Sequence, residues 1–372
     1  MFRVMSRMSR SYATLRLNEA TNDWVVCAPS RGTRPKQFAP PPPTCSTHAE
    51  TTVPDCPFCA GSEATTPDAV LTLPRNEAVD AAYPPGEGPD WRLRVVPNKF
   101  PVVAHDTTTA GKVAAADLNV PVHGLEVPAY GFHEVIVESP VHCASFASGY
   151  PSQARDVLGA FQARVAAYED DPHLRYITMF KNQGHKAGAS LAHPHSQCVG
   201  LPITPFEVLS RVETATRYHA EHNCCVFCTM LEKELAGGER VVVENDSVVA
   251  FVPFAAISPF QTWIVPKVHT HMYTALEPHV LDDFAAALVE VSARLDVVLN
   301  TPDFNMVIHQ APYHTPDWFF GEPRLPDAFH VYAEIIPRLG PGMLAGFEFG
   351  SGMSSNANSQ EQDAEDLRQA QL

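Results

Sequence analysis

The clearest periodic pattern of apolar residues lies between residues 278 and 299. Its apolar positions recur at spacings of three and four and form one stripe on a helix: Leu281, Phe284, Leu288, Val291 and Leu295. A shorter stripe of the same kind contains Val157, Phe161 and Val165. The two patterns predict helices near 278–299 and near 151–168.

Four short segments rich in β-branched and aromatic residues predict strands. They are EVIVES at 134–139, RYITMF at 175–180, TWIVP at 262–266 and YAEIIP at 332–337. Each has the length of an ordinary strand and is too short for an independent helix.

These elements occur twice in the same order, each time with the same short motifs. The first series is CPFC at 56–59, FHEVIVESPVH ending at His142, a helix, and HPHSQ at 193–197. The second is CVFC at 225–228, QTWIVPKVH ending at His269, a helix, and FHVYAEIIPR at 329–338. We therefore expect an α+β fold whose two tandem repeats share or abut one sheet.

The repeat suggests a division of the chain into four parts. We expect a flexible N-terminus at 1–15, an N-terminal repeat at 16–203, a C-terminal repeat at 204–350, and a polar tail at 351–372.

Charge and hydropathy exclude two classes of partner. The 26 basic and 42 acidic residues give a formal net charge of −16, which repels nucleic-acid backbones and anionic membranes. No apolar run is long enough for a membrane span. We expect a cytoplasmic protein; the first sixteen residues, with four arginines and no acid, leave an organellar location as the alternative.

Each repeat contains one CxxC pair and two later histidines in matching places, and four such ligands make a structural zinc site. The expected ligands of the first site are Cys56, Cys59, His142 and His193, and those of the second are Cys225, Cys228, His269 and His330. His271 and His309 are alternative ligands for the second site. Four protein ligands leave no open position for water, so both zinc ions are expected to be structural.

The segment 180–197 is the strongest indication of chemistry. Its small residues Gly184, Gly188 and Ser190 let backbone N–H groups approach a phosphate closely. Next come His193 and His195, separated by a proline that favours an extended chain. Residues i and i+2 of an extended chain face the same side, so one histidine can bind metal beside a free one.

His195 is therefore the candidate nucleophile. A neutral imidazole attacks phosphorus well, and a covalent phosphoramidate divides one transfer into two steps. Gln197 can donate an amide hydrogen bond to the phosphoryl oxygen as its charge develops. The alternative is that all these histidines are structural.

The pattern N-x-G-x-x-x-G-x-S-x-x-H-P-H-x-Q at 182–197 resembles the active-site segment of galactose-1-phosphate uridylyltransferases, within the histidine-triad superfamily. Three other segments resemble parts of that family: residues 16–34, with the pair Arg31 and Arg34; residues 96–101, with Asn98; and residues 345–348. The resemblance covers most of the chain and implies two histidine-triad-like repeats.

The resemblance implies a ping-pong reaction in which His195 takes a nucleoside monophosphate from a nucleotide sugar and passes it to a second phosphate. It implies that Asn182, Gly188, Ser190 and Gln197 contact phosphates. It also implies that Arg31, Arg34 and Asn98 face the nucleotide and that the enzyme is a homodimer acting on nucleotide sugars and sugar phosphates.

The chain departs from the galactose-handling members in two places. It has LAHPHSQ where they have a PHPHGQ motif, and it lacks the hexose-binding glutamine after Gly346-Phe-Glu. This version, with its second Cys/His site, looks more like ADP-glucose phosphorylases.

Several functions are therefore considered. The leading one is UMP transfer between UDP-hexose and hexose 1-phosphate, with adenylyl transfer from ADP-glucose to phosphate as the alternative. A histidine-triad hydrolase would let water complete the reaction, and a zinc-stabilised binding protein would form no adduct.

Overall fold

The computed structural model describes residues 13–18, 23–28, 52–83, 87–105, 126–147, 151–313, 325–339 and 345–372. Within these ranges no helix combines the length and the apolar character needed to cross a membrane.

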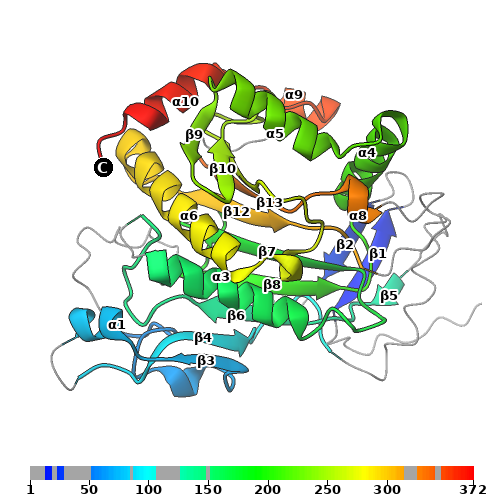
Figure 1. Ribbon diagram of the computed structural model, residues 1–372. Coiled ribbons are helices and arrows are strands. Elements are labelled where there is room, and N and C mark those ends of the chain that lie inside the picture. Colours follow the sequence, from blue (N-terminus) through cyan, green and yellow to red (C-terminus); the bar gives the residue numbers. More distant parts are fainter. Residues whose placement is uncertain are drawn as a thin grey trace, which may run out of the picture.

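A ten-stranded antiparallel sheet forms the centre of the molecule (Figure 1). Its strands, in spatial order, are β3 (Leu71–Pro74), β4 (Trp91–Pro97), β6 (His133–Val137), β8 (His195–Leu201), β7 (Tyr176–Gln183), β12 (Phe304–His309), β13 (Tyr332–Pro337), β11 (Thr262–Pro266), β10 (Val248–Phe251) and β9 (Val241–Glu244). A separate three-stranded sheet has the order β2 (Asp23–Cys27), β1 (Thr14–Asn18) and β5 (Glu126–Pro128).

The large sheet contains the sequence repeat as a two-fold pattern. From the central pair β7–β12, the order outward is β8, β6, β4, β3 on one side and β13, β11, β10, β9 on the other. Each strand of the first half therefore has a counterpart at the same distance from the centre. The α+β class and the expectation of two repeats that share one sheet are confirmed.

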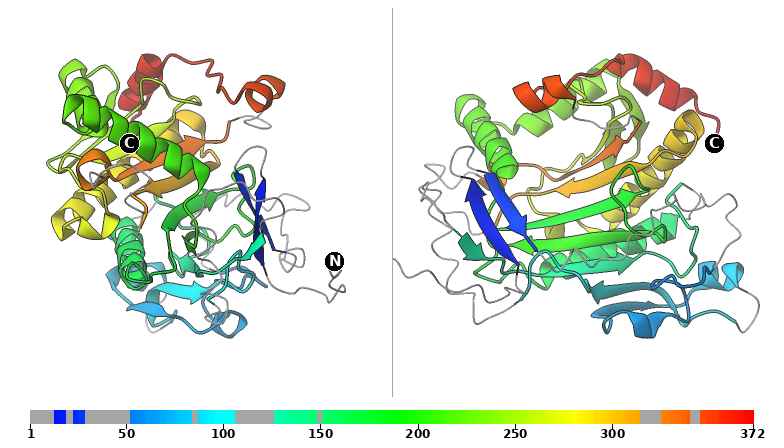
Figure 2. Two further views of the ribbon diagram at one scale, coloured as in Figure 1. Left: turned by 90° about the vertical axis from the view of Figure 1, so that its right-hand side faces the viewer. Right: turned by 180° about the vertical axis from the view of Figure 1, so that it is seen from behind.

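The described helices are α1 (Glu77–Ala82), α3 (Pro151–Ala166), α4 (Phe206–His222), α5 (Val226–Gly237), α6 (Pro278–Leu299), α8 (Leu325–Ala328), α9 (Gly346–Ser351) and α10 (Gln360–Gln369). The counterparts α3 and α6 lie against each other on one face of the sheet, and Figure 2 shows the strands from the opposite side. Residues of α4 and α5 form a second apolar cluster with strands of the second half.

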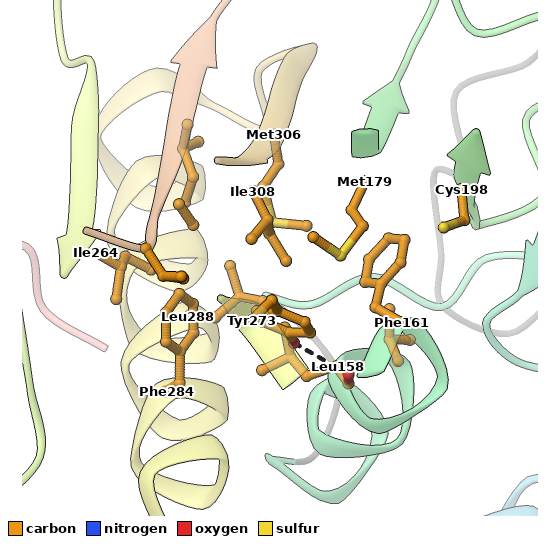
Figure 3. Close-up of a cluster of buried hydrophobic side chains, with 14 of the residues drawn as sticks. Leu158, Phe161, Met179, Cys198, Ile264, Tyr273, Phe284, Leu288, Met306 and Ile308 are labelled. Atoms are coloured by element: carbon orange, nitrogen blue, oxygen red, sulfur yellow. Dashed lines mark hydrogen bonds between the residues drawn. The ribbon is translucent and has the colours of Figure 1, made fainter. Parts of the chain in front are cut away.

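Helix α6 has the bounds that its pattern predicts. Pro278 occupies the first turn, where its missing N–H costs no hydrogen bond, and the helix ends at Asn300 in the left-handed conformation with φ 54°. All five residues of its apolar stripe are at most 1 % exposed. Figure 3 shows Phe284 and Leu288 of this stripe among the buried side chains of the core, where the Tyr273 hydroxyl donates to the carbonyl oxygen of Leu158 at 3.0 Å.

The C-terminal tail is polar in composition, yet it contains helix α10. Ser359 caps the helix by accepting a hydrogen bond from the Gln362 amide. Ala364 and Leu367 are fully buried in the main apolar cluster, and α10 packs on α6 and β9. Two apolar residues one turn apart are too few to indicate a helix from sequence, although they are sufficient to dock one.

This docking gives a stability prediction. Leu367→Ala removes a side chain that is 0 % exposed, and we expect it to lower the free energy of unfolding by about 2–4 kcal/mol. Leu372→Ala, at a position 68 % exposed five residues further along, serves as the matched control and should change it little. Equal midpoints of urea unfolding for the two variants would contradict the packing of α10 on α6 and β9.

Candidate active site

His195 is the first residue of β8, near the middle of the sheet. Its Nδ1 donates to the carbonyl oxygen of His193 at 2.8 Å, which fixes the ring and leaves Nε2 with its lone pair. The ring is only 6 % exposed, and burial lowers the pKa of His195 to about 4. The imidazole is therefore neutral at pH 7 and is available as a nucleophile.

The cavity next to His195 has a volume of about 260 Å³. Its lining is mainly apolar and includes several polar groups. The residues that line it are Asp55, Pro57, Phe58, Thr65, Thr66, Pro67, Val96, Pro97, Asn98, Lys99, Phe100, Val135, Ser190, Leu191, His195 and Gln197. A mainly apolar hollow with a few polar groups beside a nucleophile is typical of a small-molecule site.

Gln197 faces the same cavity and is oriented by His133. The Nδ1 of His133 accepts the amide N–H of Val102 at 3.1 Å, so its proton resides on Nε2. That nitrogen lies 2.9 Å from the Oε1 of Gln197 and donates to it. Asn98 is also fixed here, because its Oδ1 accepts the Phe100 amide N–H at 2.8 Å. With its oxygen bound, Gln197 keeps its amide N–H groups as donors.

The loop between β7 and β8 contains two glycines with positive φ, Gly184 at +82° and Gly188 at +85°. Within the loop, the Gly188 amide donates to the carbonyl of His185, and the Ala189 amide donates to that of Gly184. Strand β7 enters the loop through Asn182. The pairing of Phe180 with Gln197 places Asn182 on the same sheet face as Gln197, because alternate residues of a strand share a face.

The first Cys/His group brings four residues together from distant segments. Cys56, Cys59, His142 and His193 are all buried, and their ligand atoms lie within 4.8 Å of one another. The Cys59 sulfur is 3.2 Å from His142 Nδ1 and 3.6 Å from His193 Nδ1. The Nε2 of His193 donates to the carbonyl of Ser139 at 2.8 Å, which directs Nδ1 toward the sulfurs.

The second half contains an equivalent group, formed by Cys225, Cys228, His269 and His330. The Cys228 sulfur is 3.3 Å from His269 Nδ1 and 3.6 Å from His330 Nδ1. His330 Nε2 donates to the carbonyl of Pro266 at 3.0 Å, and His269 Nε2 donates to that of Pro326 at 2.8 Å.

Both groups have the composition of a metal site. In each pair one thiol donates a hydrogen bond to the other sulfur, and this lowers the pKa of Cys56 and of Cys225. Thiolates are the form that binds metal. The two groups can hold one metal ion each.

The first Cys/His group also shapes the cavity. Phe58, which stands between the two cysteines, lines the cavity and is 8 % exposed. Its ring centroid lies 5.4 Å from that of His195. Through Phe58, the loop that carries the cysteines contributes to the burial of His195.

A buried ion pair lies behind β8, on the sheet face opposite to His195. The ammonium of Lys181 donates to both carboxylate oxygens of Glu138 at 2.8 Å, and Ser196 donates to the same carboxylate. The two charged side chains are at most 1 % exposed. This pair joins β6, β7 and β8, and loss of one partner would leave the other charge buried without compensation.

The second half has no nucleophile in the position that corresponds to His195. There Tyr332 begins β13, as His195 begins β8, and it stacks between His309 and Trp263 with ring centroids 4.6 and 4.4 Å away. Glu334 takes the place of Gln197 and accepts from His309 Nε2 at 3.0 Å. The second half keeps the Cys/His group and has packed aromatic side chains at the position that corresponds to His195.

The structure places most of the predicted site residues in one region. Four of them line the cavity: Asn98, Ser190, His195 and Gln197. Asn182 and Gly188 lie on the adjoining strand end and loop, and Arg31 and Arg34 lie outside the described residues. Neither His271 nor His309 belongs to the second Cys/His group.

Sequence reasoning missed His133 and Phe58. A single histidine in the predicted strand region at 132–139 gave no signal beyond that of a buried polar residue. Phe58 was visible only as the spacer of a CxxC pair.

Two family models cover most of the chain. Residues 91–205 match the N-terminal domain of galactose-1-phosphate uridyl transferase, and residues 211–369 match its C-terminal domain.

Individual relatives agree with the family models. ADP-glucose phosphorylase from Arabidopsis thaliana is 30 % identical over 96 % of this chain and 93 % of its own length. Galactose-1-phosphate uridylyltransferase from Saccharomyces cerevisiae is 27 % identical over 81 % of this chain and 80 % of its own. The crystal structure of the Arabidopsis ADP-glucose phosphorylase with bound ADP-glucose has a TM-score of 0.69 and 28 % identity, covering 96 % of this chain and 99 % of that one.

Proposed function

Because the chain belongs to the galactose-1-phosphate uridylyltransferase family, we propose that it transfers nucleoside monophosphates through a covalent intermediate on His195. The observation that carries the proposal is the geometry of His195. Its Nδ1 donates to the carbonyl of His193, which leaves the lone pair on Nε2, and His195 and Gln197 line the same cavity.

In the first step the Nε2 lone pair attacks the α-phosphorus of a nucleotide sugar. The N–P bond forms as the bond from that phosphorus to the bridging oxygen breaks, and hexose 1-phosphate leaves with the electron pair. No proton needs to be transferred, because Nε2 starts deprotonated and the leaving group is a phosphate. The positive charge that develops on the ring is stabilised by the carbonyl of His193, which accepts from Nδ1.

In the second step a phosphate oxygen of the acceptor attacks the same phosphorus and restores neutral His195. Gln197, with its oxygen bound to His133, donates N–H to a phosphoryl oxygen. Asn182, Gly188 and Ser190 take the phosphates in this proposal. Arg31, Arg34 and Asn98 face the nucleotide, whose nucleoside occupies the apolar cavity.

Each Cys/His group holds a structural zinc ion in this proposal. Tetrahedral zinc with ordinary Zn–S and Zn–N bond lengths separates sulfur and nitrogen ligands by about 3.5 Å. Five sulfur–nitrogen distances within the two groups run from 3.2 to 3.7 Å, and all the ligand atoms of each group lie within 4.8 Å of one another, so the donor sets fit the ion. Bound zinc would link the loop that carries Phe58 to strand β8.

Two donors are consistent with the family. ADP-glucose, with inorganic phosphate as acceptor, is favoured by the higher identity and coverage of the Arabidopsis relative compared with the yeast one. The second Cys/His group and the Gly-Ser-Gly sequence after Phe349 favour it as well. UDP-hexose, with hexose 1-phosphate as acceptor, is the second candidate, since uridylyl transfer is the activity named for the family. A homodimer and a cytoplasmic location remain predictions from sequence.

The test is to incubate the protein with ADP-glucose and with UDP-glucose in turn and to weigh the intact chain. We expect a gain of one AMP from ADP-glucose, which inorganic phosphate then removes. A gain of one UMP, removed by hexose 1-phosphate, would establish the second candidate. Turnover without added acceptor would indicate a hydrolase, and no adduct with either donor would contradict the covalent mechanism.

A further inference from the structure

The two halves of the chain meet next to the proposed phosphate loop. Strand β12 of the second half pairs with β7 of the first, and this register places Asn305 directly opposite Asn182. Asn182 is the penultimate residue of β7, which ends at Gln183 directly before the loop 184–190. The second half therefore has side chains within reach of the loop.

Asn305 connects the two halves through its side-chain amide. Its Nδ2 donates to the Oδ1 of Asn182 at 2.7 Å and to the carbonyl of Ala187 in the loop at 2.9 Å. Its own Oδ1 accepts a hydrogen bond from the Nε of Arg338, at the end of β13. The side-chain amides of both asparagines are therefore oriented by their partners.

This orientation has a direct consequence for Asn182. Because its oxygen is occupied by Asn305, its Nδ2 presents only N–H groups to the proposed phosphates. A chain of hydrogen bonds runs from the Arg338 guanidinium through Asn305 to Asn182. Hydrogen bonds in such a chain polarise one another, so the charge of Arg338 strengthens the donor at its far end.

Asp303, two residues before Asn305, holds the other side of the loop. Its carboxylate accepts the amide N–H of Lys186 at 2.6 Å, and its backbone carbonyl accepts the amide of Arg338 at 2.7 Å. A Cβ added to Gly184 would lie 1.9 Å from an Asp303 oxygen. The close approach of Asp303 therefore leaves no room for a side chain at position 184.

We propose that Arg338, Asn305 and Asp303 of the second half are positioning residues that hold the loop 184–190 and Asn182 as donors for the substrate phosphates, with Arg338 acting through Asn305. This inference rests on the proposed function, which places those phosphates at the loop. It assigns the second half a role in the first-half site although the second half has no nucleophile in the corresponding position. In a chain of net charge −16, the relay directs amide N–H donors toward bound anions.

The test separates binding of the phosphate from binding of the nucleoside. In Arg338→Met, and in the isosteric Asn305→Asp, the dissociation constant of the nucleoside monophosphate should rise roughly tenfold or more. The dissociation constant of the uncharged nucleoside should stay unchanged. The pair is AMP and adenosine, with UMP and uridine run in parallel, and calorimetry gives both constants. Adduct formation from the nucleotide sugar in a single turnover should slow by a similar factor.

Arg240→Met is the matched control, since Arg240 is also a half-buried arginine, paired with Glu234 and Glu361 far from the cavity lining. It should leave both constants unchanged. Equal weakening of nucleoside and nucleotide in the Arg338 and Asn305 variants would overturn the inference, because a purely structural defect acts on both ligands.

The inference and the proposed function fail in different ways. A wild-type protein that forms the adduct, with variants that bind the monophosphate and react as wild type does, would overturn only the inference. A wild-type protein that forms no adduct, but binds the monophosphate more tightly than the nucleoside through Arg338, would overturn only the covalent function.

Discussion

His195→Ala is expected to abolish adduct formation and to lower turnover by at least about 10³-fold, because the variant has no atom that can form the N–P bond. Among the described residues, the ring donates one hydrogen bond, to the carbonyl of His193, and His195 belongs to neither Cys/His group. Folding and metal content should therefore remain close to those of the wild type. Intact-mass measurement, initial rates and elemental analysis check the three parts.

His219→Ala is the matched control for this variant, because His219 is similarly buried but lies on α4, outside the cavity lining and both Cys/His groups. It should retain the adduct. If His195→Ala instead lost one metal ion per chain, the roles assigned to His193 and His195 would be reversed. Retained activity in His195→Ala would remove the covalent mechanism.

Cys56→Ser is expected to lower the zinc content by one per chain and the Tm by roughly 5–10 °C. The site joins segments that are far apart in the chain, so a metal ion bound there would contribute directly to the folding free energy. Activity should also fall, since Phe58 would no longer be held against the ring of His195. Elemental analysis and thermal unfolding provide the two measurements.

Cys224→Ser is the control for the loss of a thiol. Cys224 is exposed and belongs to neither Cys/His group, so its replacement should leave zinc content and Tm as they are. Unchanged zinc in Cys56→Ser would remove Cys56 from the ligand set, and a loss of both metal ions would show that the two sites are coupled.

Elements with a local cause could be predicted from sequence. The prediction of helix α6 needed only the spacing of its apolar residues. The relation of His193 to His195 needed only the extended chain around Pro194, because residues two apart on a strand share a face. In both examples the deciding contacts lie within a few residues.

The two Cys/His groups are the exception among long-range features. Cys56 and His193 are 137 residues apart, yet the sequence placed them together. The repeat made this possible, because it showed the same four residue types in the same order twice. A sequence motif that occurs twice in the same order can indicate which distant residues lie together, whereas a single copy cannot.

Other long-range contacts had no such signal. Asn305 and Asn182 are 123 residues apart, and no sequence motif links the two positions. Only the pairing of β12 with β7 makes them neighbours. Helix α10 was missed for a related reason, since its burial depends on the surface that α6 and β9 present to it.

The amino-acid sequence was sufficient to predict the two-repeat α+β organisation, the two Cys/His groups and His195 as the candidate nucleophile. Each of these follows from spacing or from repetition, which are properties of the chain alone. The folded structure was needed to identify the side chains that position the groups around His195. They are His133 behind Gln197, Phe58 against the His195 ring, and Asn305 with Arg338 behind Asn182. Those contacts join strands and loops that are neighbours only in the folded sheet, and a hydrogen bond or ring contact depends on distance in space, not on separation along the chain.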